Sequence, residues 1–224
     1  HAPGAVSLAT NTGATLRAMR PPAGGARLRD GEVIEGRGVA LRAVATPGHS
    51  TDHVAFWIEE TRGLFTGDAV LGRGTSVIDP PEGDLAAYLR SLRRMRELEP
   101  RTIYPGHGPT VFRGVAKLDE YLAHREEREA QVLSALQGEP RSIDELVEVI
   151  YVGYPDDVRP LAARSVLAHL MKLAGEGRVD HATKAGVKRY TATEPRACAR
   201  CGRPVRGKAT YCGACSLAML QGTE

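Results

Sequence analysis

The sequence predicts an α/β protein: a layered α/β domain, followed by an α-helical winged-helix domain and a small zinc ribbon. Strand-like runs alternate with an amphipathic helix in the first half of the chain. Helices and then a hairpin follow, in the order of a winged helix. Two CxxC pairs come last, at the spacing of a zinc ribbon. We therefore expect domains at residues 1–137, 138–194 and 195–224.

The composition is that of a soluble globular protein. With 224 residues, 42% of them hydrophobic and 25% charged, the chain can form an apolar core. A net charge of +3 is too small to indicate nucleic acid or membranes by itself. The sequence has no apolar run long enough to span a bilayer, and its cysteines suit metal binding in a reducing compartment. We expect a cytoplasmic protein with no membrane partner.

The first domain is predicted from short strand-like runs that glycine and proline separate. One helix interrupts them: Asp84 can cap it, apolar residues recur at helical spacing from Leu85 to Met95, and Pro100 lies beyond its end. Strands alternating with such a helix are typical of a layered α/β domain. The predicted strands cover residues 39–46, 53–59, 64–66 and 102–104.

The winged helix is predicted from helix signals and one hairpin. A helical apolar pattern through Leu136 ends at Gly138 and Pro140, and Ser142 with Glu145 forms a capping box for the next helix. A further apolar stripe consists of Leu167, Leu170, Met171 and Ala174. Strand-like runs follow at residues 178–182 and 187–191, around the turn Lys184, Ala185 and Gly186.

Metal-ligand chemistry concentrates in the first domain. His49 in TPGHSTDH, Asp68 in LFTGDAVLG and His107 in IYPGHGP each follow or end a strand-like run beside glycine. Such turns expose a polar side chain at a sheet edge with little steric bulk around it. Imidazoles with a carboxylate suit zinc or a similar ion that can activate water. Taken singly, each of these residues is an ordinary turn residue.

These motifs resemble the metallo-β-lactamase superfamily: TPGHSTDHVAFWIEETRGLFTGDAVLG followed by YPGHGP matches its later motifs. The resemblance implies an αββα sandwich, incomplete at the N-terminus, with two metal ions. It implies that His1, the last histidine of an H-x-H-x-D-H motif, and His107 bind one ion. His49 then binds the other and Asp68 bridges both. The remaining ligands and the general base are expected upstream of His1, so this fragment itself is expected to be inactive.

A narrower resemblance is to the β-lactamase-like protein 2 branch, an endoribonuclease-type branch with a C-terminal winged helix. It rests on TPGHSTDH, GDAVLG, IYPGHGP and the helices around HLMKLAGEGRV. It implies a metal-dependent hydrolase that cuts single-stranded RNA. His53 also matches, and we expect it to orient the His49 loop rather than to bind metal.

The function has two alternatives. One is a thioesterase or glyoxalase-II-like enzyme acting on a small ester, because one fold hosts many chemistries. The other is a nonenzymatic nucleic-acid-binding protein that uses the winged helix and the cysteine module. Arg164, Lys172 and Lys188 are the candidate phosphate contacts. A solvated face that covers the active site or forms a homodimer explains these charges equally well.

The tail carries a second metal signal. The cysteines are spaced C-x-x-C and C-x-x-C around a short basic loop, a set of four thiolates that can close a tetrahedral structural zinc site. The ribbon is too short for an apolar core, so we expect the metal to supply its folding energy. The four predicted ligands are Cys198, Cys201, Cys212 and Cys215.

Overall fold

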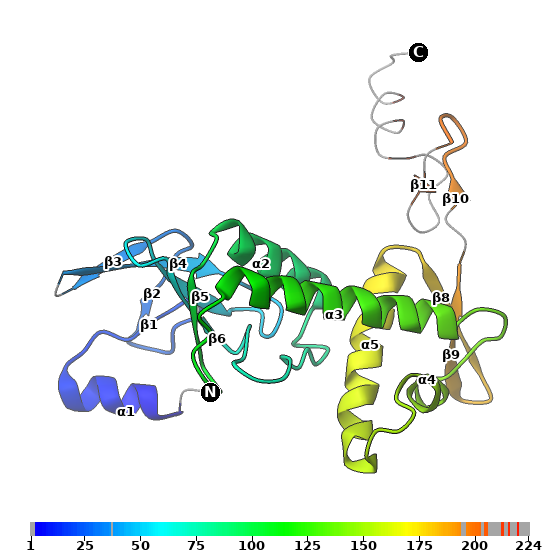
Figure 1. The fold of residues 1–224 in the computed structure, drawn as a ribbon, viewed down its shortest axis with the longest axis horizontal. Helices are drawn as coiled ribbons and strands as arrows, with labels where there is room; N and C mark the ends of the chain where they lie inside the picture. The colour runs from blue at the N-terminus through cyan, green and yellow to red at the C-terminus, as the bar shows by residue number, and fades with distance from the viewer. Residues whose placement is uncertain are drawn as a thin grey trace. The chain divides into compact units, whose positions relative to one another are not determined.

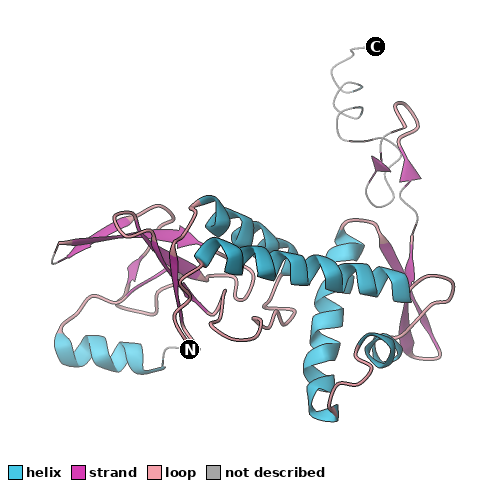
Figure 2. Cartoon of the chain, in the orientation of Figure 1, coloured by secondary structure: helices cyan, strands magenta, loops and turns pink. Residues whose placement is uncertain are grey.

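The computed structural model describes residues 3–36, 38–193, 196–202 and 204–205, and the single positions 212, 215 and 219. The chain divides into two compact units, residues 1–124 and 125–224. Figure 1 colours the chain from its N-terminus to its C-terminus, and Figure 2 separates helices from strands. Among the described residues, no helix combines the length and apolar character needed to cross a bilayer.

The first unit is built on a five-stranded sheet in the order β3-β4-β5-β6-β7. Its first four strands are successive antiparallel neighbours, and β7 lies parallel to β6 after a crossover through α2. The predicted strands are confirmed within one or two residues. These are the four strands β4 Val39–Ala45, β5 Val54–Ile58, β6 Gly63–Gly67 and β7 Thr102–Pro105. Strand β3, Val33–Gly36, was not predicted.

Helix α2, Leu85–Glu97, forms as its sequence pattern predicts. The Asp84 side chain accepts a hydrogen bond from the Ala87 N–H, which caps the first turn. The apolar stripe of α2 is buried, including Tyr88, Leu92 and Met95 at 0% exposure. An ion pair between Arg96 and Asp119 links α2 to α3, Gly114–Ala135.

One face of the sheet is buried and the other carries exposed aromatic rings. Trp57, Leu64 and Ile103 are opposed across β5, β6 and β7 and are almost fully buried. On the opposite face Phe65 stacks on Tyr104 with ring centroids 4.9 Å apart, and both remain partly exposed. The unit begins with α1, Pro3–Thr12, and the parallel pair β1, Arg17–Ala18, and β2, Ala26–Arg27.

The second unit contains the predicted winged helix. The Ser142–Glu145 capping box opens α4, Ile143–Ile150, and a 3₁₀ turn, Asp156–Val158, leads into α5, Arg159–Gly175. Strands β8, Val179–Lys184, and β9, Val187–Ala192, form the hairpin. Its core joins the end of α3 to these elements through Val132, Leu136, Leu146, Val166, Leu170, Leu173 and Tyr190. A two-stranded ribbon, β10 Arg196–Ala197 and β11 Pro204–Val205, follows.

Candidate metal centre

A glycine fixes the loop between β4 and β5 that carries His49. Gly48 has a φ of 138°, and a side-chain carbon added there would lie 2.3 Å from the Tyr88 Cα. The carbonyl of Gly48 also accepts a 2.8 Å hydrogen bond from the Asp84 N–H. Only glycine avoids the clash with Tyr88, so the His49 loop can lie directly against the start of α2.

Asp68 and His107 follow the neighbouring parallel strands β6 and β7. Parallel strands end at the same edge of a sheet, so residues that follow them meet there. The Gly106 N–H donates a 2.8 Å hydrogen bond to the Gly67 carbonyl, which holds the two strand ends together. A Cβ at Gly106 would lie 2.9 Å from Asp68 Oδ1. Glycine at position 106 therefore keeps room for the carboxylate.

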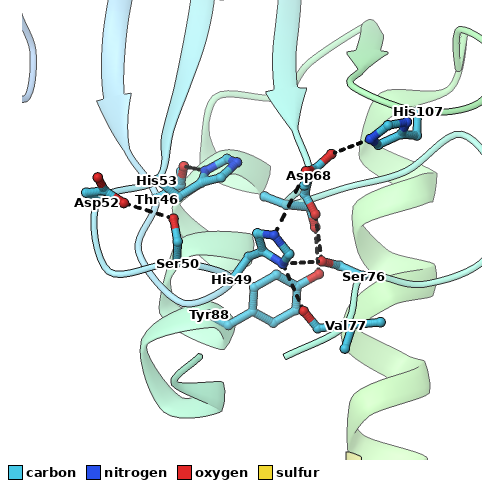
Figure 3. A network of polar contacts seen from close by, with 11 residues as sticks. Thr46, His49, Ser50, Asp52, His53, Asp68, Ser76, Val77, Tyr88 and His107 are labelled. Atoms are coloured by element: carbon cyan, nitrogen blue, oxygen red, sulfur yellow. Dashed lines mark hydrogen bonds and ion pairs between the residues drawn. The ribbon is translucent and has the colours of Figure 1, made fainter. Parts of the chain in front are cut away.

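The three predicted ligands converge on one point, with Asp68 between the two histidines (Figure 3). Asp68 Oδ2 lies 3.9 Å from His49 Nε2, and Asp68 Oδ1 lies 3.4 Å from His107 Nε2. The side chains of His49 and Asp68 are 21% and 18% exposed, whereas that of His107 is 72% exposed. The centre is therefore closed around His49 and open to solvent at His107.

The imidazole of His49 is oriented by its other nitrogen. His49 Nδ1 lies 2.8 Å from the Val77 carbonyl oxygen, which can only accept, so Nδ1 carries the proton. Ser76 lies 3.3 Å from the same nitrogen and donates a 2.6 Å hydrogen bond to the Asp68 carbonyl. Nε2 is therefore the nitrogen that faces the Asp68 carboxylate. An outer hydrogen bond of this kind usually orients a metal-binding histidine.

His53 lies behind the centre, where it closes the base of the His49 loop. Its Nδ1 is 2.8 Å from the Thr46 hydroxyl, and its carbonyl accepts a 3.0 Å hydrogen bond from the Thr46 N–H. The rings of His53 and His49 are 6.2 Å apart, edge to face. Burial, and then the nearby His49, lower the pKa of His53, which favours the neutral ring. This position suits the predicted role of orienting the loop, which stays a prediction.

The donor set fits a metal ion. Two atoms that each lie about 2.0–2.2 Å from one tetrahedral zinc ion are roughly 3.4 Å apart. The two gaps between Asp68 and the histidines, 3.4 and 3.9 Å, are close to that value. Each oxygen of Asp68 faces a different imidazole, so the carboxylate is placed as a bridging ligand would be. His1, the fourth predicted ligand, lies outside the described residues.

The four tail cysteines also come together and could hold a metal. Their sulfur atoms all lie within 4.8 Å of one another. Backbone N–H groups, Cys212 first, lower the pKa of the Cys198 thiol to about 6. A hydrogen bond with Cys201 and burial raise the pKa of Cys215 to about 12. A nearby cation would favour the thiolate form of every member.

The predicted phosphate contacts are placed unequally. Lys172 is 12% exposed and is paired with Glu129 and with Glu176, the latter at 3.0 Å. Lys188 is exposed, with its Nζ 5.4 Å from the centre of the Tyr190 ring. Arg164 is an exposed residue of α5. Contact of these residues with nucleic acid stays a prediction, and Lys172 is already engaged by carboxylates.

The supporting residues were missed by sequence reasoning. No motif includes Ser76 or Val77, because the partner they share, His49, lies 27 and 28 residues earlier in the chain. Its sequence pattern makes Tyr88 an ordinary core residue of α2, yet its hydroxyl donates a 2.6 Å hydrogen bond to the carbonyl of Ala69, next to the predicted ligand Asp68. The only local signal near Tyr88 is Gly48, which reflects the close approach of the His49 loop to the Tyr88 Cα.

In comparison with known proteins, each of the two units contains a match to a family model. Residues 2–107 match the family model of the metallo-beta-lactamase superfamily. Residues 142–188 match the beta-lactamase associated winged helix domain. The chain is 39% identical over 154 residues to a beta-lactamase-like protein 2 homolog of Caenorhabditis elegans, covering 68% of this chain and 50% of that protein.

Two further relatives match a similar share of the chain. The chain is 36% identical to an atrochrysone carboxyl ACP thioesterase of Aspergillus chevalieri, covering 76% of this chain and 57% of the relative. It is 33% identical, with a TM-score of 0.65, to the crystal structure of a metallo-beta-lactamase family protein from Thermus thermophilus. That match covers 77% of this chain and 56% of the solved one. The chain thus spans about half the length of the curated relatives it matches.

Proposed function

Because the chain contains a metallo-β-lactamase superfamily domain followed by the winged-helix domain associated with it, we propose a metal-dependent hydrolase that cleaves single-stranded RNA. One observation carries the hydrolytic part. Asp68 lies between His49 and His107 and directs a separate oxygen to each. Proteins of this fold family are generally hydrolases, so the centre is the natural place for the chemistry.

The residues of the chain hold and orient two zinc ions in this proposal. His49 would hold one ion through Nε2, since Nδ1 is committed to the Val77 carbonyl. His107, on the exposed side, would hold the other ion, and the Asp68 carboxylate would supply a ligand to each. When bound, such ions activate water and polarise the bond to be cleaved. Burial of His49 and Asp68 limits solvent access on one side, so substrate approaches from the exposed His107.

The RNA assignment rests on the winged-helix domain and on the branch that the sequence resembles. The hairpin of this domain carries Lys184, Lys188 and Arg189, and winged helices commonly use a helix and hairpin for phosphate contacts. Arg189 is engaged with Glu145, which leaves the two lysines as the stronger candidates. A thioester is the second candidate substrate, because a relative 36% identical to the chain is named a thioesterase.

A cleavage assay tests the proposal. The whole protein in its natural length, loaded with zinc, is incubated with single-stranded RNA, DNA of the same sequence and an acyl thioester. We expect RNA cleavage that Asp68→Ala lowers by more than about a hundredfold, since losing an outer partner alone costs 10–100-fold. Asp119→Ala, which removes the surface ion pair with Arg96, is the control and should cleave normally.

Each other outcome changes the assignment. Hydrolysis of the thioester without cleavage of RNA would replace the nuclease by a thioesterase. RNA that binds but is never cleaved, with or without zinc, would overturn the hydrolase in favour of a nonenzymatic binding protein. Equal activity of the Asp68→Ala variant would remove the His–Asp centre from the reaction.

A further inference from the structure

The first pair of tail cysteines lies in the turn of a short hairpin. Strands β10 and β11 pair antiparallel, with Arg196 opposite Val205. Cys198 directly follows β10, and its carbonyl accepts a 2.9 Å hydrogen bond from the Gly202 N–H. Gly202 has a φ of 69°, a left-handed conformation that glycine adopts easily. The turn thus brings Cys201 back beside Cys198.

The spacing of the sulfur atoms suits one ion. In a tetrahedral site with Zn–S bonds of about 2.3 Å, two sulfurs are roughly 3.8 Å apart. The Sγ atoms of Cys201 and Cys212 are 3.6 Å apart, too far for a disulfide bond. All four sulfurs lie within 4.8 Å of one another. Cysteine sulfurs that surround an iron–sulfur cluster with several iron atoms must lie farther apart than this. Four thiolates fill every position of such a site, so none remains for water or substrate.

The buried cluster of the tail consists mostly of these ligands. Among the described residues it contains Cys198 at 3% exposure, Cys215 at 9% and Val205 at 6%, with Cys212 packed against them. Burial of one valine stabilises by about 1.5–3 kcal/mol. Ordering each backbone residue costs about 1–2 kcal/mol, so this apolar contact cannot hold the ribbon. An ion bound to all four sulfurs supplies the missing connection.

The charge of the segment complements such a centre. Four thiolates around one divalent ion carry a net charge of −2. Between Glu194 and Glu224 the sequence has no aspartate or glutamate. The same stretch contains five basic residues, Arg196, Arg200, Arg203, Arg206 and Lys208. This excess of positive charge offsets that of the metal centre.

We propose that Cys198, Cys201, Cys212 and Cys215 bind one structural zinc ion that holds the tail in its folded form. The site is separate from the His–Asp centre and does not depend on the proposed hydrolase activity. Both family matches end before Cys198, so neither domain model includes it.

The experiment measures metal in chains whose His–Asp centre is disabled. The 224-residue chain carrying Asp68→Ala and His107→Ala is purified, dialysed and analysed for zinc, iron and free thiols. We expect about one zinc per chain, held by thiols that resist alkylation until a chelator is added. Cobalt substituted for the zinc should give the intense visible absorption of a tetrahedral tetrathiolate site.

Two variants complete the test in the same background. Cys212→Ser should lose the zinc, because a ligand is missing. Arg200→Ala, which changes the same segment and leaves four thiols in place, should retain it. Iron in place of zinc, two disulfide bonds, or a zinc content unaffected by Cys212→Ser would each overturn the proposal. The RNA assay of the whole protein is unaffected by these outcomes, so the two proposals fail separately.

Discussion

The predicted ligands of the His–Asp centre lie on three loops of a unit that has its own apolar core. In the tail, by contrast, the cysteines themselves form most of the described buried cluster. Around Asp68, the sheet and α2 bury Leu64, Tyr88 and Ile103 without any metal ligand taking part. In the tail, the described buried cluster contains a single residue, Val205, that is not a cysteine. One candidate metal centre therefore lies beside a core that forms without it, and the other candidate ligands are themselves most of the local core.

This difference teaches what a metal would do at each place. A centre positioned by glycine contacts and hydrogen bonds can exist before the metal arrives, and it can leave a position open for chemistry. When the ligands themselves make up the core, the centre forms only after the metal binds, and four thiolates leave no position for a substrate. The two proposals together therefore assign a catalytic role to the His–Asp centre and a structural role to the four cysteines.

Metal removal should separate the two centres most strongly. A chelator should abolish protection of the tail amides against hydrogen exchange, because one valine contact cannot replace the metal. Protection of β4 to β7 should persist, since their core contains no ligand. Mass spectrometry of exchanged peptides measures both regions in one sample. If the tail amides stayed protected after chelation, folding of the tail would not depend on metal, and the two regions would no longer differ in this respect.

The next largest effect is expected at the loop glycine of the His–Asp centre. Gly48→Ala places a methyl group 2.3 Å from the Tyr88 Cα, which lies in a helix and cannot turn aside. Overpacking of this kind costs about 1–3 kcal/mol in free energy of unfolding, measured by urea denaturation. Gly31→Ala is the control, because its φ of 78° is also positive but nothing lies within 4 Å. Equal losses in the two variants would mean that backbone strain alone matters.

A smaller effect is expected from the residue that supports both ligands. Ser76→Ala removes the 2.6 Å hydrogen bond to the Asp68 carbonyl and the contact with His49 Nδ1. Loss of such an outer partner should weaken zinc binding at the His–Asp centre by about 10–100-fold, measured by competition with a chelating dye. Ser50→Ala, whose hydroxyl bonds to Asp52 in the same loop, is the control. An unchanged affinity would show that Val77 alone orients His49.

The smallest effect is expected in the winged helix, whose described core contains no cysteine or other predicted ligand. The Ser142 N–H, and then Arg189, lower the pKa of Glu145 below its ordinary value of 4.5. A lowered pKa means that this stabilisation is present above pH 4.5 and is lost as the pH falls through the folded value. Thermal melting of Glu145→Gln should therefore differ from that of the parent near neutral pH and approach it in acid.

Glu148→Gln is the matched control for that measurement, because it removes an exposed carboxylate from the same helix. It should shift the melting temperature less than Glu145→Gln at neutral pH. A constant difference between Glu145→Gln and the parent from neutral to acid would exclude the capping box as its source. Together with chelation, this result shows whether the winged helix depends on local charge rather than on metal.

Much of the fold follows from local sequence signals. Asp84 and the Ser142–Glu145 box act as caps where the sequence places them, because capping needs only residues within one helical turn. Four of the five strands of the sheet are confirmed for the same reason, since strand-forming runs between glycines and prolines are local signals. Strand β3 was not predicted. The grouping of His49, Asp68 and His107 was expected from the motifs and the family they resemble, and the structure brings the three side chains together.

The sequence alone determined which metal-binding side chains the chain offers and their order: imidazole, carboxylate, imidazole, and then four thiols. These are chemical properties of single residues at readable spacings. Only the tertiary structure decided which oxygen of Asp68 faces which histidine, and that Val77 and Ser76 contact the ring of His49. It also paired Lys172 with Glu129, far away in the sequence. Such contacts join residues tens of positions apart, and packing of the whole unit, not a local pattern, determines them.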